Sequence, residues 1–427
     1  MSEKTEYINA ENYEKIIKEN ELVIVDWYST ECPPCEALAT KYDSLSELYG
    51  NDVKFVKIFR QENKDLAAEL GISGSPTVTF YKNGKLTGET LRGGIKRSSL
   101  IENLNTLLPS SRVTKINSLT KTSETSCDVL ILGGGPAGLS AGIYTAQAKL
   151  NTIIIDIALP GGQVATTHLV SNFPGQPKAI QGFMLAHYMS EQAKEAGVSY
   201  RSAVDVTNIN LAGKKITIDS VETITAKKII IATGASPRAL GIPGELEYKG
   251  QGISYCATCD AKYYEGKEVV VVGGGNSAIE EALFLAKFAS KITIVHQFDK
   301  LQANKQAQEK AFNEKKISFL FKHEPREFKK TDNGITITLE DLKTKEVKKL
   351  ETNGVFMFVG MNPNIDGMRE DLTLDEWGYV KSDEEMRTNI KDVYAAGDVR
   401  SKMYRQITTA VADGTIASIS ISKELEN

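Results

Sequence analysis

Two glycine-rich turns constrain the fold of this chain more than any other feature of its sequence. Each follows a run of aliphatic residues and precedes a helical pattern: an expected strand at 128–132 leads into the turn 133–138, and an expected strand at 269–272 leads into the turn 273–278. The G-x-G-x-x-G/A spacing lets the backbone approach a pyrophosphate at a helix N-terminus. One such motif is weak evidence, but two in strand–turn–helix–strand context predict two α/β units that each bind a dinucleotide.

These motifs supply candidate cofactor-binding residues. The strand expected at 152–155 ends in Asp156, near the position where an acid binds a ribose hydroxyl. The matching strand of the second unit, at 292–295, ends in His296. The candidates within the turns are Gly133, Gly135, Pro136, Ala137 and Gly138 in the first, and Gly273, Gly275, Asn276, Ser277 and Ala278 in the second.

The cysteines form a second pattern. Four of the 5 make two Cys-x-x-Cys pairs, Cys32/Cys35 and Cys256/Cys259, and only Cys127 stands alone. A four-cysteine zinc site places its pairs about 15–20 residues apart, whereas about half of this chain separates these two. No metal ion is therefore expected, and two separate dithiols suggest catalytic thiol–disulfide exchange.

Composition excludes several other classes. The chain is 41% hydrophobic and 25% charged, with a net charge of −4 and no long block of Lys or Arg, so neither nucleic acid nor an anionic membrane surface is an expected partner. No apolar run approaches the roughly 20 residues that span a bilayer. The polar, acidic stretch 1–15 is unlike a signal peptide. We expect a cytoplasmic protein.

The first 108 residues carry the first dithiol. A β-rich run at 22–28 leads into Cys32, and a helical pattern begins at Glu36. Cys32 is thus expected at a helix N-terminus, where unpaired N–H groups and the helix dipole favour a thiolate.

With Asp26, the Cys32/Cys35 pair, Lys57 and Pro76 in register, residues 1–108 resemble thioredoxin. The resemblance implies that Asp26 is a buried acid, that Cys35 resolves mixed disulfides formed at Cys32, and that Pro76 is cis and faces the dithiol. Where the family has Trp-Cys-Gly-Pro-Cys, this chain has Glu-Cys-Pro-Pro-Cys at 31–35, which removes part of the usual docking surface. Residues 109–125 are rich in Ser, Thr and Lys without a clean period and are expected to form a flexible linker.

Residues 126–427 are similar to low-molecular-weight thioredoxin reductases. The sequence Cys-Ala-Thr-Cys-Asp at 256–260 is close to diagnostic for that family. The flavin-binding positions of the family are matched by Gly161, Gly162, Gln163, Asn172, Thr233, Gly234, Gly397, Asp398, Arg405 and Gln406.

The resemblance implies the fold class and domains. We expect an α/β protein in which a thioredoxin fold precedes two Rossmann-like, three-layer domains. The FAD-binding domain is expected in two pieces, 126–241 and 357–427, and the NAD(P)H-binding domain at 242–356 carries the redox motif. Crossover segments at about 238–246 and 353–362 are expected to act as hinges, because the dithiol cannot face flavin and thioredoxin at once. The family also implies a homodimer.

The implied chemistry is an electron relay from NADH or NADPH through FAD. Electrons pass to Cys256/Cys259, with Asp260 supplying or accepting a thiol proton. They continue to Cys32/Cys35 and then to disulfide-containing client proteins, such as a peroxiredoxin.

The electron donor is the point where the chain departs from the family. The family recognises the NADPH 2′-phosphate with a His-Arg-Arg-x-x-x-Arg run, but residues 296–302 read His-Gln-Phe-Asp-Lys-Leu-Gln, so all three arginines are absent. This favours NADH slightly over NADPH. The stretch is also similar to the NADH-dependent flavoprotein of the alkyl hydroperoxide reductase system, which remains an alternative serving one peroxiredoxin. Ferredoxin as donor and a non-catalytic redox sensor are further alternatives.

Overall fold

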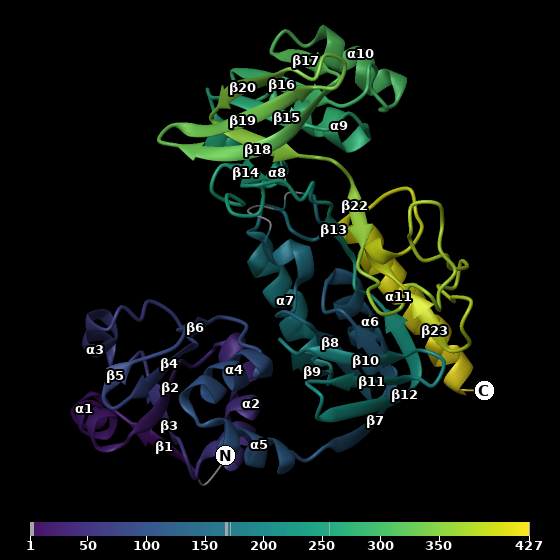
Figure 1. Cartoon of the computed structure of the whole chain (residues 1–427). Helices are drawn as coiled ribbons and strands as arrows, with labels where there is room; N and C mark the ends of the chain where they lie inside the picture. The colour runs from purple at the N-terminus through teal and green to yellow at the C-terminus, as the bar shows by residue number, and fades with distance from the viewer. Residues whose placement is uncertain (1–3, 167–169, 171, 256, 427) are drawn as a thin grey trace.

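The computed structural model describes residues 4–166, 170, 172–255 and 257–426, without the side chains of residues 258 and 259. Three α/β units follow along the chain (Figure 1). We name them the N-terminal unit (4–118), the first dinucleotide unit (123–237 and 361–426) and the second dinucleotide unit (238–360). The predicted fold class is confirmed.

The N-terminal unit has a mixed sheet of order β1-β3-β2-β4-β5, with β6 paired to β4. The central strand β2 is apolar on both faces because helices cover both: α2 packs Leu38, Tyr42 and Leu45 on one side, and α1 packs Ile16 and Ile17 on the other. Its elements are β1 (Thr5–Ile8), α1 (Ala10–Glu19), β2 (Leu22–Tyr28), α2 (Pro33–Tyr49), β3 (Lys54–Phe59), α3 (Lys64–Glu69), β4 (Thr77–Lys82), β5 (Lys85–Leu86), β6 (Leu91–Arg92) and α4 (Arg97–Leu107).

The predicted flexible linker at 109–125 is wrong for most of its length. Helix α5 (Ser110–Ser118) occupies its first half, and strand β7 already begins at Ser123. The helix forms because Ile116 joins the apolar cluster of the N-terminal unit and Arg112 Nε donates to Asp52 Oδ1 at 2.7 Å. Within 109–125, only Pro109 and residues 119–122 lie outside helix and strand.

The first dinucleotide unit has a sheet of order β10-β11-β12-β7-β8-β9, with β23 paired to β12. Helices α6 and α11 pack closely on one face, where a Cβ on Gly414 would lie 2.1 Å from the Ala137 carbonyl oxygen. Its elements are β7 (Ser123–Leu132), α6 (Pro136–Gln147), β8 (Thr152–Asp156), η1 (Gly162–Thr166), α7 (Gly182–Glu195), β9 (Ser199–Ser202), β10 (Val206–Asn210), β11 (Lys215–Ile218), β12 (Glu222–Ile231), β13 (Ala235–Pro237), β22 (Met361–Pro363), β23 (Val393–Ala395), η3 (Gly397–Val399) and α11 (Ile407–Glu426).

The second dinucleotide unit combines a parallel sheet of order β14-β21-β15-β16-β17 with an antiparallel sheet of order β18-β19-β20. Buried aliphatic residues of β15 and β16 fit a parallel sheet covered on both faces. Its elements are β14 (Ile253–Ser254), α8 (Ala257–Asp260), η2 (Ala261–Tyr264), β15 (Glu268–Val272), α9 (Asn276–Leu285), β16 (Lys291–His296), α10 (Lys305–Asn313), β17 (Ile317–Phe321), β18 (His323–Thr331), β19 (Gly334–Asp341), β20 (Val347–Thr352) and β21 (Gly354–Met357).

The two dinucleotide units are joined by two crossing chains. Strands β13 and β22 pair antiparallel at the crossing, and Figure 1 shows this ribbon beneath the second dinucleotide unit. The boundary predicted between 356 and 357 falls inside β21, because Met357 pairs with Val272 of the parallel sheet. Within the described residues, no helix is long and apolar enough to cross a membrane.

Candidate active site

The first dithiol lies at the start of α2. Cys32 is the N-cap residue of the helix and Pro33 occupies its first turn, where a missing N–H costs nothing. Cys32 and Cys35 form a disulfide with a Cα–Cα distance of 5.2 Å. The Cys35 N–H donates to Cys32 Sγ at 3.3 Å, so the helix terminus is poised to stabilise a thiolate there once the bond is reduced.

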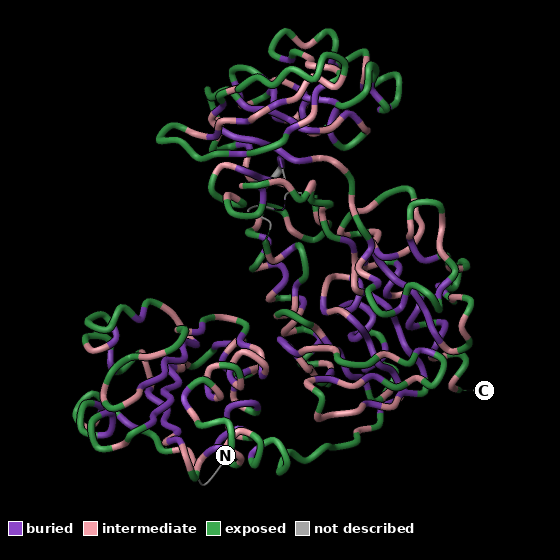
Figure 2. The backbone as a smooth tube through the Cα atoms, viewed as in Figure 1, coloured by how far each residue is buried: buried purple, intermediate pink, exposed green. Residues whose placement is uncertain are grey.

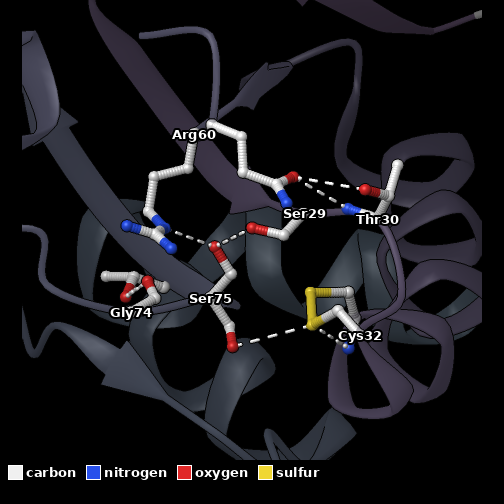
Figure 3. Close-up of a disulfide and its surroundings, with 9 residues drawn as sticks. Ser29, Thr30, Cys32, Arg60, Gly74 and Ser75 are labelled. Atoms are coloured by element: carbon white, nitrogen blue, oxygen red, sulfur yellow. Dashed lines mark hydrogen bonds between the residues drawn. A yellow bond between two sulfur atoms is a disulfide. The ribbon is translucent and has the colours of Figure 1, made fainter. Parts of the chain in front are cut away.

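Backbone and side chains around Ser75 complete this site (Figure 3). The Ser75–Pro76 peptide bond is cis, as the resemblance predicts. Cys32 Sγ lies 3.6 Å from the Ser75 carbonyl oxygen. The Ser75 hydroxyl oxygen accepts hydrogen bonds from Ser29 Oγ at 2.7 Å and Arg60 Nε at 2.9 Å, two contacts that the sequence did not indicate.

Asp26, on β2, is the buried acid that the resemblance predicts, with 2% of its surface exposed. Burial raises the pKa of its carboxyl group to about 7, against the attraction of Lys57. Lys57 Nζ is paired with Asp43 at 2.8 Å, and Asp26 Oδ1 accepts no hydrogen bond from the described residues. The carboxyl group can therefore hold or release a proton near neutral pH.

The first glycine-rich turn has the geometry of a phosphate cradle. Gly133 has φ +107°, and a Cβ there would lie 2.4 Å from the Ala232 carbonyl oxygen. Gly135 is the N-cap of α6 and receives no side-chain capping bond. A Cβ on Gly135 would meet only Gly162 Cα, at 3.8 Å, so space and N–H groups are both open to a pyrophosphate. Pro136, Ala137 and Gly138 form the first turn of α6.

Several predicted flavin-binding residues meet around this turn. Asp156 Oδ2 accepts from the Gly134 N–H at 2.6 Å, and burial raises the pKa of Asp156 above its usual value. The Gly161 N–H donates to the Gly134 carbonyl oxygen at 2.6 Å, while Asn172 Nδ2 donates to Gln406 Oε1 at 3.3 Å. Gln163 Nε2 donates to the Ala235 carbonyl oxygen, and Thr233 Oγ1 donates to that of Asn364 at 2.6 Å, next to Gly234.

Asp398 is a half-buried acid of this unit that can accept hydrogen bonds from a bound cofactor. Its Oδ1 is buried and accepts no hydrogen bond from the described residues, although Lys402 Nζ lies 3.4 Å away. Burial raises the pKa of Asp398. A buried carboxylate oxygen that accepts no hydrogen bond fits a hydroxyl-rich group such as the ribityl chain of FAD.

Asp413, which sequence reasoning missed, organises the surroundings of Asp398. Asp413 Oδ2 accepts from the Gly397 N–H at 3.0 Å and from Lys402 at 2.9 Å, and Oδ1 accepts from Arg400 at 2.9 Å. In the sequence, Asp413 could have been found as a lone acid in the otherwise apolar and small-residue stretch 410–418.

The predicted flavin-binding residue Arg405 stacks over the Tyr379 ring, 3.7 Å from its centroid.

The second glycine-rich turn repeats the first. Gly273 has φ +134°, and its Cβ would lie 2.2 Å from the Phe358 carbonyl oxygen. Gly275 is the uncapped N-cap of α9, with Asn276, Ser277 and Ala278 following in its first turn, and nothing lies within 4 Å of its added Cβ. This turn therefore also fits a dinucleotide pyrophosphate.

The loop after β16 borders this second turn. His296 is buried, its Nε2 accepts or donates no hydrogen bond within the described part of the chain, and burial lowers its pKa. Phe298 packs edge-on against the His296 ring, with centroids 5.3 Å apart. The Gln302 N–H donates to the Gly274 carbonyl oxygen at 2.8 Å. Residues 297–300 and Gln302 are exposed, so this loop forms the rim of the cradle.

The second dithiol lies largely outside the described residues. Cys256 is not described, nor is the side chain of Cys259, whose backbone belongs to the short helix α8. Asp260 Oδ2 accepts a hydrogen bond from Ser254 Oγ at 2.6 Å.

Glu245 is a fully buried carboxylate that the sequence did not single out. It accepts hydrogen bonds from the Leu240 and Gly241 N–H groups at 3.0 and 2.8 Å, and from the Tyr255 hydroxyl at 2.8 Å.

Comparison with known families decides the classification. The model of the pyridine nucleotide-disulphide oxidoreductase family matches residues 127–414, and the thioredoxin family model matches residues 4–106. The chain belongs to the pyridine nucleotide-disulphide oxidoreductase family. Its N-terminal unit is in addition a thioredoxin domain.

Relatives of this oxidoreductase cover its C-terminal part. It is 43% identical to a thioredoxin reductase from Peptoclostridium acidaminophilum, over 71% of this chain and 98% of the relative. It is 44% identical to a 34.2 kDa protein in the rubredoxin operon of Clostridium pasteurianum, over 70% of this chain and 97% of the relative. The crystal structure of Lactococcus lactis thioredoxin reductase in its FR conformation is 42% identical, with a TM-score of 0.57, and covers 70% of this chain and 98% of that one.

Proposed function

We propose that this oxidoreductase is a flavin-dependent thioredoxin reductase that carries its own thioredoxin, and that it passes electrons from NADH or NADPH to protein disulfides. The observation that carries the proposal is the union, in one chain, of two open glycine cradles with a Cys-x-x-Cys disulfide at a helix N-terminus. The names of the relatives, which cover the two dinucleotide units, support the reductase half.

The residues of the first cradle fit FAD. Its ribose, pyrophosphate and ribityl groups would be held by Asp156, by the uncapped N-terminus of α6 and by the buried Asp398 Oδ1, respectively. Bound FAD supplies a two-electron carrier between a dinucleotide and a dithiol. The second cradle, at Gly273–Gly275, would hold the nicotinamide donor.

The dithiols then exchange in sequence. A thiolate of the Cys256/Cys259 pair attacks the Cys32–Cys35 disulfide, forming a mixed disulfide and releasing Cys35 as a thiolate. The remaining thiolate of the Cys256/Cys259 pair then attacks its partner sulfur in the mixed disulfide, which closes the Cys256–Cys259 disulfide and releases Cys32 as a thiolate. Two electrons have moved, and Cys32/Cys35 ends reduced. The reduced pair repeats the exchange on a client disulfide, where Cys35 resolves the mixed disulfide formed at Cys32. Asp26 can take up or return the thiol proton near pH 7.

The test of the relay uses the full chain with bound flavin. It should reduce insulin disulfides with no thioredoxin added. Cys32→Ser should abolish insulin reduction, since the nucleophile is lost, while anaerobic bleaching of the flavin by the donor continues. Cys127→Ser is the matched control, because this buried thiol belongs to neither pair. Undiminished insulin reduction by Cys32→Ser would reject the serial relay.

For the donor, we favour NADH. The exposed rim at 297–302 offers no arginine to a 2′-phosphate, and Asp299 would repel one. Stopped-flow reduction of the flavin by NADH, NADPH and reduced ferredoxin, measured in parallel, decides the question. A tenfold advantage of NADPH would overturn this assignment, and reduction by ferredoxin alone would exclude both dinucleotides.

We further propose a cytoplasmic homodimer that serves disulfide-containing clients such as a peroxiredoxin. The α6–α11 face exposes Tyr144, Ile416 and Ile419, an apolar surface suited to a second copy. Sedimentation of the native chain and of Ile419→Glu should give a dimer and a monomer respectively. A monomeric native chain would contradict the proposal.

A further inference from the structure

The N-terminal unit and the first dinucleotide unit meet at a contact built around one buried lysine. Lys41 lies on α2 and is only 8% exposed. Its Nζ donates to the carbonyl oxygen of Ile95 at 3.1 Å, and to those of Ser202 and Ala203 in the other unit at 2.8 and 2.7 Å. All three protons of the ammonium group are therefore used. Because an unpaired buried charge is strongly unfavourable, these carbonyl groups form a specific binding site for the Lys41 ammonium group.

Charged groups around Lys41 are complementary across the contact. Lys96 Nζ pairs with Asp205 Oδ1 at 2.8 Å, and Ser98 Oγ donates to Asp205 Oδ2 at 2.5 Å. Asp219 Oδ1 accepts a hydrogen bond from the backbone N–H of Asp205 at 2.8 Å, which keeps these two acidic residues next to each other. At the edge, Glu36 on α2 pairs with Lys194 on α7 at 2.8 Å. Opposite charges thus face each other at both places, with Lys96 against an acidic group and Glu36 against a basic one.

The contact borders a loop next to the first dithiol, although Gly94 in that loop stays exposed. A Cβ on Gly94 would lie 3.4 Å from Leu159 Cγ and 3.7 Å from Ala203 Cβ. The neighbouring Gly93 N–H donates to the Pro76 carbonyl oxygen at 3.2 Å, and Cys32 Sγ lies beside Ser75. Loop 93–95 and Cys32 therefore flank the same backbone at 75–76, across which a client disulfide must approach.

The docked position of the N-terminal unit is separate from the position where its dithiol would be reduced. In Figure 1, helix α8 of the redox motif belongs to the second dinucleotide unit, which lies at the opposite end of the first dinucleotide unit from β9 and the N-terminal unit. The N-terminal unit is tied to this body by residues 119–122 alone, which extend to about 14 Å at most. It must leave the contact to take part in exchange. Figure 2 shows the exposed link running between the two bodies.

We propose that residues 202–205, together with Leu159 and Asp219, form a docking surface for the thioredoxin domain of this same chain. The domain rests there with Gly94 against Leu159 and Ala203, and departs to collect and deliver electrons. The inference rests on the proposed function for its role in turnover, but the docking itself is independent of activity.

A disulfide trap tests the docking directly. The 3.7 Å distance between the built Cβ of Gly94 and Ala203 Cβ lies within the disulfide range. In a Cys32→Ser, Cys35→Ser background, Gly94→Cys with Ala203→Cys should form a bond on treatment with diamide, a mild thiol oxidant. Peptide mapping by mass spectrometry should identify the linked pair. Failure to form it in a protein that retains flavin would overturn the proposal.

The same engineered disulfide also tests whether the docked thioredoxin domain is inactive in insulin reduction. With Cys32 and Cys35 restored, the oxidised double variant should reduce insulin at least tenfold more slowly than either single cysteine variant, while flavin reduction by NADH stays unchanged. Full insulin reduction by the trapped protein would overturn the proposal. If the native chain reduces no insulin while the double cysteine variant still forms the trap, only the proposed function is rejected.

Charge reversal tests the recognition. Lys96→Glu should slow trap formation about threefold, as expected for a partly exposed ion pair, and adding Asp205→Lys should restore the rate. The matched control is Lys18→Glu, whose ion pair with Glu14 lies entirely within α1 and should leave the rate unchanged. Equal trapping rates in all these variants would contradict docking through the Lys96–Asp205 ion pair.

Discussion

The two glycine-rich turns have similar backbone conformations but differ in the residue that faces their middle glycine. Gly133 and Gly273 both have positive φ and both lie against a carbonyl oxygen of a neighbouring segment. A Cβ on Gly134 would lie 3.0 Å from Asp156 Oδ2, whereas one on Gly274 would lie 2.5 Å from the His296 ring. The same turn thus presents a carboxylate in one unit and a buried imidazole in the other.

The difference indicates how two copies of one motif select different ligands. Each turn supplies N–H groups to a pyrophosphate, which both cofactors share. Specificity comes from the end of the following strand: a carboxylate there accepts ribose hydroxyl groups, while the rim after His296 decides whether a 2′-phosphate is tolerated. The turns also differ at their last position, Gly138 against Ala278.

The largest expected effect on flavin binding comes from giving the first turn the alanine that the second turn has at its last position. In Gly138→Ala, the added Cβ would lie 1.9 Å from the Gly133 carbonyl oxygen, a backbone clash at the upper end of the roughly 1–3 kcal/mol that overpacking costs. We expect flavin affinity to fall at least about a hundredfold, measured by fluorescence titration of the flavin-free protein. The reverse change Ala278→Gly should leave flavin binding intact. Normal flavin content in Gly138→Ala would show that α6 can shift without loss.

Removing the acid of the first cradle should have the next largest effect. Asp156→Ala deletes an acceptor of the Gly134 and Ala158 N–H groups and of the proposed ribose contact. A hydrogen bond to a charged group contributes about 1.5–3 kcal/mol, so flavin should bind about 10- to 100-fold more weakly in the same titration. His296→Ala should leave that affinity unchanged. Equal losses in both variants would contradict the division of roles between the cradles.

The rim of the second cradle should change donor preference more modestly. Gln297→Arg with Phe298→Arg places two cations at exposed positions, where each can meet a 2′-phosphate. We expect the ratio of kcat/KM for NADPH over NADH to rise about tenfold, the equivalent of about 1.4 kcal/mol. Stopped-flow flavin reduction measures both. An unchanged ratio would place phosphate recognition elsewhere, with Lys300→Ala as the first variant to examine.

Local patterns made the cradles predictable from sequence, whereas contacts between units could not be predicted. The strand at 22–28, both glycine turns and the placement of Cys32 follow from short-range periodicity and spacing. Residues 109–125 lack such a pattern because α5 depends on tertiary contacts, Ile116 with an apolar cluster and Arg112 with Asp52. Lys41 is likewise an ordinary helical lysine in sequence, and only the opposing carbonyl groups give it a role.

The smallest expected effect tests whether a histidine at the rim can act as a charge sensor. Burial lowers the pKa of His296 below its ordinary value of 6.5, so it is neutral at pH 7 and gains a proton only under more acidic conditions. The NADPH/NADH preference of the native chain should therefore stay nearly constant between pH 8 and about pH 6.5, where buried His296 stays neutral.

Gln297→His introduces an exposed imidazole with a pKa near 6.5, which becomes charged as the pH falls through that value. Its attraction for a 2′-phosphate should raise the NADPH/NADH ratio about threefold between pH 8 and 6, relative to the native chain at the same pH. Gln302→His, on the same exposed rim but bonded through its backbone to Gly274, serves as the positional comparison. A native chain whose ratio already rises through pH 7 would show that His296 is charged there, and that its burial does not isolate it from the donor.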